Sequence, residues 1–277
     1  MNDKSGLPRY DSPPVIEVVL SVQFDPIDEL HVPHFGVLWS QFRPDFPRTE
    51  EHPPIPPVIE TFGQFALARL GFQVEMSELS LLPRLWFLNE PGTELIQVQQ
   101  DRFIHNWRKT DSGQEYPHYP YIRRRFETEL KTFSSFLESE KLPRLKMNQC
   151  EVTYINHIVA GDGWQTHSEV AKVLCPWSAQ CSDEFLPDPE DVNLNIRYRF
   201  YDGEKNPMGR LHIKLQPAYR NVDQKAIFVL TLTSRGRPVG DGLQGALAFL
   251  DIGREWIVRG FTSVTTKEMH RIWKRTQ

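Results

Sequence analysis

The sequence predicts an α+β protein made of two similar halves, each with the order strand, helix, three strands and helix. Two observations lead to this prediction. Several segments alternate apolar and polar residues with the period of two that half-buried antiparallel strands show, and each half closes with a long amphipathic helical stripe. The same order of elements occurs twice, although the halves share little residue identity. We therefore expect one curved antiparallel sheet with the long helices packed on one face.

The first half is expected to span residues 15–147, after a flexible tail at 1–14. Runs rich in β-branched residues mark its strands, and Asp25-Pro26 ends the first of them. The elements predicted here are a strand at 15–24, a helix at 35–42, an extended connector at 43–57, strands at 66–80, 84–89 and 94–108, and a helix at 119–138. The connector is rich in proline, so a proline-rich recognition motif is the alternative interpretation.

The second half is expected to span residues 148–277. The elements predicted here are a strand at 149–159, a helix at 164–174, an acidic loop at 182–191, strands at 192–201, 209–216 and 226–234, and a helix at 242–264. After them, Thr265 and Glu268 have the spacing of a capping box, which predicts a short final helix.

Alternation is clearest in two strands of the second half, where one face carries polar side chains. These are Asn193, Asn195, Arg197, Arg199 and Tyr201 on one strand and Arg210, His212, Lys214 and Gln216 on the other. By contrast, the run from Leu85 to Leu88 is apolar on both faces, so we expect it to lie centrally in the sheet.

Composition limits the class of protein. A formal net charge of −4 argues against a whole-surface nucleic-acid binder. Cys150, Cys175 and Cys181 have no close spacing, which indicates free thiols and a reducing compartment. No apolar run approaches the roughly 20 residues that span a bilayer, and the polar N-terminus lacks a signal peptide. We therefore expect a soluble cytoplasmic protein without membrane contact.

The candidate binding residues belong mainly to one basic sheet face. They are Arg102, Asn106, Trp107 and Arg108 in the first half and Arg197, Arg199, Arg210 and Lys214 in the second. Such a face, with Trp107 and Tyr201 nearby, could hold an anion or a single nucleic-acid strand. The alternative is a polar network that sets strand register, or an ordinary solvated face.

Two further candidates, Asn156 and His157, interrupt an otherwise apolar strand and must point to opposite faces. A hydrogen-bonded core network and a catalytic histidine are the two interpretations. Acid–base chemistry could also be drawn from Asp101, His105 and Glu151, although the sequence sets no distance between them. Because no metal-ligand spacing, nucleophile elbow, phosphate loop or dinucleotide fingerprint occurs, we expect no metal, no cofactor and no catalytic residues.

Four segments together resemble a sporadically distributed prokaryotic family of uncharacterised proteins. They are Pro13 to Val18, the stretch from Pro83 through Gln97-x-Gln99-x-Asp101 to Arg108 with Tyr116-Pro117-x-Tyr119, Cys150 to Ile158, and Gly253 to Trp273. The resemblance covers nearly the whole chain in the same motif order. It implies no activity and carries over no catalytic residue. The family's patchy distribution implies an association with defence or mobile loci.

Three functions follow as hypotheses. The first is a non-enzymatic interaction protein, a regulatory or immunity partner of a neighbouring gene product, with a homodimer as one candidate assembly. The second is a binder of a small molecule or nucleotide in a cavity between helices and sheet, suggested by Asn106, Asn156 and His157. The third is an enzyme on nucleic acid that uses the basic sheet face. The expected shape resembles the TATA-box-binding protein or helix-grip architecture, which carries no functional weight.

Overall fold

A single antiparallel sheet organises the fold. The fold is known from a computed structural model, which describes residues 6–62, 82–111, 113–178 and 185–277. The strands are β1 (Val15–Phe24), β2 (Arg48–His52), β3 (Arg84–Leu88), β4 (Glu94–Gln99), β5 (Arg102–Arg108), β6 (Met147–Val159), β7 (Leu194–Tyr201), β8 (Pro207–Tyr219) and β9 (Ala226–Gly236). Within the described residues they form a nine-stranded sheet in the order β2-β3-β4-β5-β1-β6-β9-β8-β7. The sheet and α+β class are thus as predicted.

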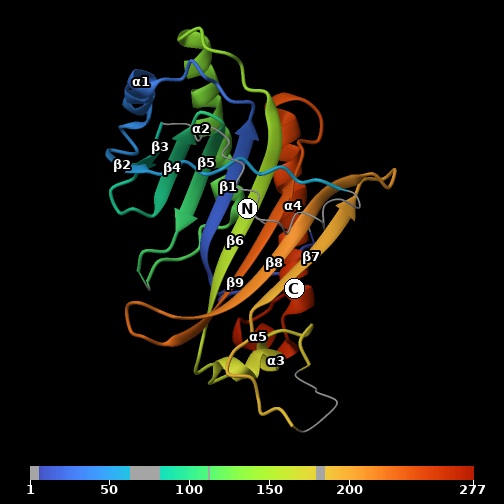
Figure 1. Ribbon diagram of the computed structural model, residues 1–277. Helices are drawn as coiled ribbons and strands as arrows, with labels where there is room; N and C mark the ends of the chain where they lie inside the picture. Colours follow the sequence, from blue (N-terminus) through green and yellow to red (C-terminus); the bar gives the residue numbers. More distant parts are fainter. Residues whose placement is uncertain (1–5, 63–81, 112, 179–184) are drawn as a thin grey trace.

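The two long helices lie on one face of this sheet (Figure 1). They are α2 (Tyr119–Ser139), which packs against β5, and α4 (Gly242–Val264), which packs against β6, β8 and β9. The remaining helical elements are α1 (Val32–Phe42), the 3₁₀ turn η2 (His167–Glu169), α3 (Val170–Val173) and α5 (Lys267–Ile272). No helix in the described parts of the chain has the length and apolar character needed to cross a bilayer.

The core lies between the sheet and the two long helices. The apolar stripe of α2 is buried as predicted, and Phe133 stacks on Phe103 of β5 with ring centroids 5.2 Å apart. On α4, a Cβ at Gly253 would lie 3.2 Å from atoms of both Ser234 and Val152. The glycine therefore lets this helix approach β6 and β9 closely.

Two expectations about the first half were wrong. Residues 94–108 form a hairpin, β4 and β5, instead of one strand. The backbone carbonyls of Gln100 and Asp101 in its turn accept hydrogen bonds from Ile27 and Phe24, at 3.0 and 2.9 Å. The connector at 43–57 contains β2, which pairs with β3. The strand predicted at 66–80 lies outside the described residues.

The run from Leu85 to Leu88 is not central, because it forms β3 beside the edge strand β2. It is apolar on both faces because each face of β3 is covered. On one face Phe87 contacts Phe42 of α1. On the other face the Trp86 ring stacks on His52 of β2, with ring centroids 3.8 Å apart.

Two expectations about the second half also need correction. The helix predicted at 164–174 is reduced to η2 and α3. Residues 164–166 are not helical, and the buried Trp164 packs there on Phe228 of β9 with ring centroids 4.4 Å apart; at the other end the chain leaves the helix at Leu174, before Cys175 and Pro176. In α5, Thr266 is the N-cap instead of Thr265, and its hydroxyl accepts a hydrogen bond from the Met269 N–H.

Candidate functional site

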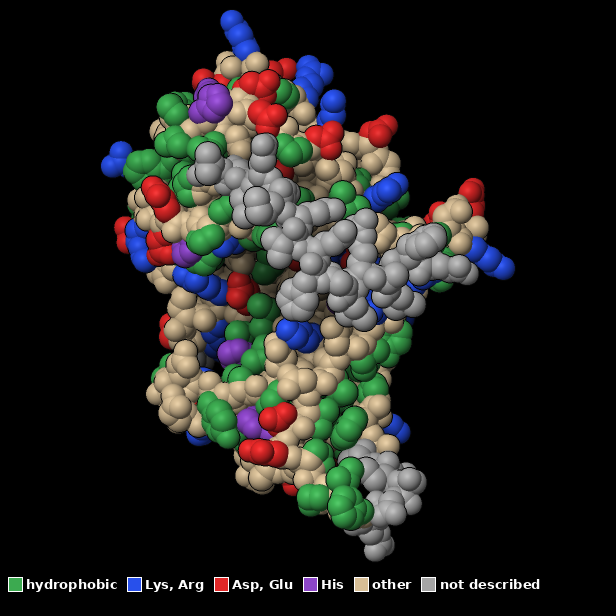
Figure 2. Space-filling view, in the orientation of Figure 1, with side chains coloured by type: hydrophobic (Ala, Val, Ile, Leu, Met, Phe, Trp, Pro, Cys, Tyr) green, Lys and Arg blue, Asp and Glu red, His purple; other side chains and the backbone are tan. Residues whose placement is uncertain are grey.

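The face of the sheet away from α2 and α4, called here the open face, carries most of the predicted binding residues. Cross-strand register places Arg199 opposite Arg210 and Arg197 opposite His212 on β7 and β8. Figure 2 shows this side of the molecule, where basic side chains (blue) and acidic ones (red) are interspersed. Strand alternation therefore puts charged groups from both ends of the sheet onto one surface.

Residues 53–62, called here the crossing segment, run over the open face across the strands (Figure 1). The side chains of three glutamines form hydrogen bonds with the main chain of the crossing segment. Gln99 of β4 accepts from the Ile55 N–H at 3.0 Å and donates to the Ile55 carbonyl at 2.9 Å. Gln23 of β1 accepts from the Val58 N–H at 2.9 Å, and Gln149 of β6 accepts from the Glu60 N–H at 3.1 Å. Strands β4, β1 and β6 thus bind the main chain of the crossing segment at Ile55, Val58 and Glu60, in the order in which it passes over them.

Glu60 anchors the end of this segment. Its side chain is 4% exposed and its carboxylate binds Arg210 and His212 of β8, with Arg235 of β9 at 3.5 Å. Burial by itself raises the pKa of Glu60, but the His212 hydrogen bond and the charges of His212, Arg210 and Arg235 outweigh it and lower the pKa. The carboxylate is therefore held in its charged form.

Arg102 belongs to the same row. It donates to the Gln23 side-chain oxygen at 2.5 Å and to the Pro56 carbonyl at 3.2 Å. Burial lowers the pKa of this arginine. Its role in this structure is to hold the crossing segment.

Asn106 and Arg108 lie in a polar network nearby. Asn106 accepts from Gln97 at 2.7 Å and donates to Glu17 at 2.6 Å, which links β4, β5 and β1. Arg108 donates to the Gly92 carbonyl at 2.8 Å. These hydrogen bonds belong to a polar network that fixes the register of neighbouring strands.

Trp107 points to the opposite side of the sheet. It is buried under the helices, and its ring centroid lies 5.4 Å from that of Tyr116. It therefore does not join the other predicted residues, whereas Tyr201, 51% exposed, lies at the end of β7.

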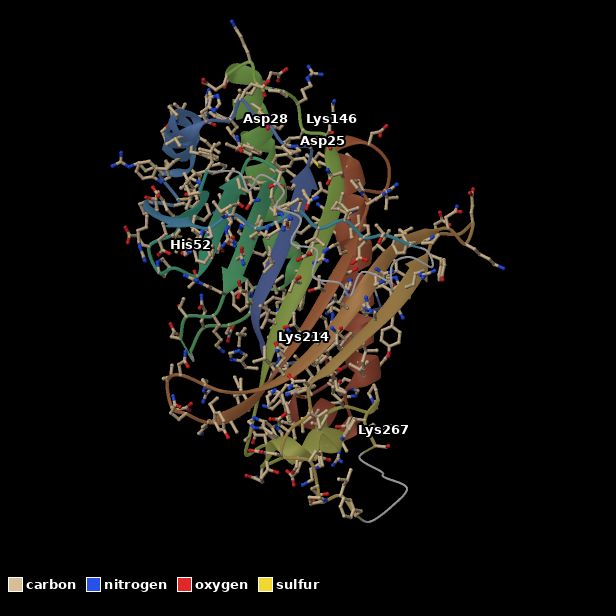
Figure 3. All side chains as sticks on the ribbon, in the orientation of Figure 1. Asp25, Asp28, His52, Lys146, Lys214 and Lys267 are labelled. Atoms are coloured by element: carbon tan, nitrogen blue, oxygen red, sulfur yellow. The ribbon has the colours of Figure 1, made fainter. Side chains whose placement is uncertain are left out.

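Three cations at the β7–β8 end of the open face are exposed: Arg197, Arg199 and Lys214. Arg199 lies over the Phe62 ring at 5.8 Å. None of the three forms an ion pair with a carboxylate of the described residues. Lys214 lies in front of β8 in Figure 3, far from Lys267 of α5. Within the described parts of the chain these three exposed cations therefore form a positive patch that no carboxylate neutralises.

Asn156 and His157 point to opposite faces, as predicted. Asn156 is buried on the helix side and donates to the Leu230 carbonyl at 3.0 Å. His157 is half-buried on the open face, and burial followed by the charge of Arg220 lowers its pKa. The pair therefore forms no shared site.

The acid–base trio considered from the sequence does not assemble. Asp101 lies in the β4–β5 turn and binds Gln99 at 2.5 Å, while Glu151 binds Arg235 at 2.5 Å on the open face. His105 is on the helix side and fully buried. The sheet separates His105 from Glu151, so the three residues cannot act on one substrate.

His105 has a partner that the sequence reasoning missed. Its Nδ1 lies 2.7 Å from Oε2 of Glu129 on α2, and the two side chains are 0% and 4% exposed. A signal was present, because Glu129 is seven residues after Ile122 and three after Phe126, within the apolar stripe. Both side chains are buried between the sheet and α2, so we interpret this pair as structural.

Among the described residues no group of His, Cys, Asp or Glu side chains has the arrangement of a metal site. Cys150 and Cys175 are free thiols, the first buried, and Cys181 lies outside the described residues. No protein-family model matches the chain, and a comparison with curated proteins finds no significant match.

Proposed function

We propose that this chain is a non-enzymatic binding protein that recognises an acidic, extended segment of a partner protein on the open face of its sheet. The observation that carries the proposal is the way Gln99 binds both the N–H and the carbonyl of Ile55, at 3.0 and 2.9 Å. A side-chain amide can accept from the N–H and donate to the carbonyl of one residue, so it binds the main chain whatever side chain that residue carries. The open face thus has chemistry suited to extended polypeptide.

The expected acidity of the partner follows from the positive patch. The crossing segment supplies one carboxylate, Glu60, which neutralises charge at Arg210, His212 and Arg235. Arg197 and Lys214, on the neighbouring rows, are exposed and have no such partner within the described residues. A partner segment with glutamate or aspartate beside the crossing segment would complete the pattern, and charge complementarity would also speed association.

The order of elements supports two finer proposals. From the centre outward the strands run β1, β5, β4, β3 on one side and β6, β9, β8, β7 on the other. This correspondence supports an internal duplication and a sheet of TATA-box-binding-protein or helix-grip type. The family resemblance, for its part, favours a cytoplasmic regulatory or immunity protein that acts with a neighbouring gene product.

The test is a binding titration with a fluorescent ten-residue oligoglutamate at low salt. We expect saturable binding that weakens as salt is raised, because the attraction is between exposed charges. The double variant Arg197→Glu/Lys214→Glu should abolish it. Lys267→Glu is the matched control, since Lys267 is an exposed lysine on α5. Equal binding by the double variant and the control would refute the proposal.

The nucleic-acid alternative is decided in the same experiment. A single-stranded ten-nucleotide DNA carries similar charge, and its phosphate contacts would be strongest at low salt. Tighter binding of this DNA than of oligoglutamate, lost in the double variant, would assign the positive patch to nucleic acid and overturn the peptide proposal. Cross-linking in the native host, followed by identification of the peptide bound near β7, would then name the partner.

A further inference from the structure

Strand β7 forms one end of the sheet (Figure 1). Within the described residues it pairs with β8 on one side and with no strand on the other. The outer edge of such a strand presents a row of backbone N–H and C=O groups to which another strand can add. β7 has eight residues and therefore extends over about 26 Å, which is long enough to pair with a short peptide.

On the open face, the side chains beside this edge are basic. Arg197 and Arg199 are exposed, and neither forms an ion pair with a carboxylate of the described chain. Arg199 lies over the uncharged Phe62 ring at 5.8 Å and so keeps its full charge. Side chains on neighbouring strands face each other across about 5 Å, so acidic side chains of an added strand would lie next to the two arginines. Charge thus favours an acidic strand at this edge.

On the helix side, the same strand is apolar and only partly covered. Helix α4 packs against β6, β9 and β8, and its Trp256 stacks on Phe200 near the end of β7, with ring centroids 4.7 Å apart. Ile196 is half-buried, whereas Tyr198 is 40% exposed and Trp256 is 37% exposed. Burying apolar side chains of an added strand against this surface is favourable. Because neighbours along a strand point to opposite faces, the edge is complementary to alternating acidic and apolar residues.

Two competing arrangements are disfavoured by charge. At the other end of the described sheet, β2 has only five residues and carries Glu50 and Glu51, which would repel an acidic strand. A second copy of the chain is a poor occupant of β7. Two copies joined antiparallel through β7 in one continuous sheet would place the arginines of each beside those of the other, and like charges on neighbouring strands are destabilising.

We infer that a partner segment with alternating acidic and apolar residues adds to the outer edge of β7 as a further strand. Its acidic side chains lie beside the two arginines of β7 on the open face, and its apolar side chains pack on Ile196 and Tyr198 on the helix side. The inference rests on the proposed function, which supplies the acidic extended segment, and specifies its backbone pairing and sequence pattern. In this mode of recognition main-chain hydrogen bonds give affinity and alternate side chains give specificity.

Two capped peptides of equal length, composition and charge test the sequence pattern. One alternates glutamate and valine over eight residues, and the other has four glutamates followed by four valines. Each carries a fluorescent label and is titrated with the purified full chain at low salt. The alternating peptide should bind about tenfold more tightly than the block peptide, because several favourable cross-strand pairs together are worth about that factor.

N-methylation of the alternating peptide tests the backbone pairing. In an extended chain the N–H groups of alternate residues point to opposite edges, so the glutamate N–H groups lie along one edge and the valine N–H groups along the other. Only one edge of the peptide can pair with β7. Methylating the nitrogens of one residue type should therefore weaken binding by about tenfold or more, and methylating the other type should change the affinity by less than about twofold.

A variant of the chain tests the apolar side of the edge. Tyr198→Ser should weaken the alternating peptide about threefold, because it removes part of the surface on which the valines pack. Tyr219→Ser is the matched control, since Tyr219 is an exposed tyrosine of β8 beyond the residues that pair with β7. Equal effects of the two variants would contradict the predicted packing.

The outcomes separate this inference from the proposed function. If oligoglutamate binds but the alternating and block peptides have equal affinity, the pairing at β7 is overturned and the proposed function stands. The same conclusion follows if the two methylated peptides bind equally well. If neither oligoglutamate nor the alternating peptide binds, both proposals are overturned.

Discussion

Replacing Glu60 with glutamine is expected to lower the free energy of unfolding by about 1.5–3 kcal/mol and to loosen the crossing segment. Breaking a fully buried ion pair costs about 3–5 kcal/mol, because it leaves an uncompensated charge. Here the cations Arg210, His212 and Arg235 are 12%, 26% and 21% exposed, so water can solvate them in part. The cost should therefore resemble the loss of one charged hydrogen bond, about 1.5–3 kcal/mol.

Urea unfolding and amide hydrogen exchange together measure this effect. The Ile55, Val58 and Glu60 amides, each bound to a glutamine of the sheet, should exchange faster in the variant. Glu51→Gln, an exposed position on β2, is the control. If the two variants matched in unfolding free energy and in exchange of these amides, Glu60 would not be the anchor.

The same carboxylate predicts a dependence on pH. The folded-state pKa of Glu60 is lowered from 4.5, so the unfolded state takes up protons first as the solution is acidified. The charged Glu60 carboxylate contributes its full stabilisation above pH 4.5, and this contribution is lost as the pH falls through the folded-state pKa. Glu60→Gln should flatten this part of the curve of stability against pH.

Four further variants test the core and the histidines by urea unfolding. Glu129→Leu should cost about 1–3 kcal/mol because it leaves the His105 ring nitrogen buried without its hydrogen-bond partner, whereas His105→Leu/Glu129→Leu should recover part of the loss; a double variant as unstable as the single one would contradict this. Phe133→Ala should cost about 3–5 kcal/mol through a cavity under α2, and a loss below 1 kcal/mol would show that the site collapses. Burial lowers the pKa of His157 and His270 from 6.5, so stability should fall as the pH drops through 6.5 toward their folded-state pKa values; His157→Gln/His270→Gln should reduce that slope, and an unchanged slope would rule these histidines out as its cause.

Elements with a sustained period could be predicted from the sequence. The strand at 15–24 and the helix at 242–264 have the expected bounds, and the helix at 119–138 differs by one residue. Their apolar residues repeat for several turns or alternations, and burial of one face follows from that repeat. The polar outer face of β7 and β8 was predicted for the same reason.

Features that depend on distant contacts were not predictable in this way. The turn at Gln100 and Asp101 lies in a polar run without the glycine or proline that commonly marks a turn, and residues before α1 bind its carbonyls. Glu129 pairs locally with Arg125 at i,i+4 and also with His105 across the core. The spacing of four residues along a helix is visible in a sequence, whereas the contact with His105, 24 residues away, is not.

The amino-acid sequence by itself determined the α+β class, the long helices and the strands that carry charge on one side, because periodic burial is a local property of neighbouring residues. Only the tertiary structure decided that residues 53–62 lie across the open face and that β7 lies at one end of the sheet. The hydrogen bonds that hold Val58 and Glu60 join residues 35 and 89 positions apart, and no local pattern contains such a distance.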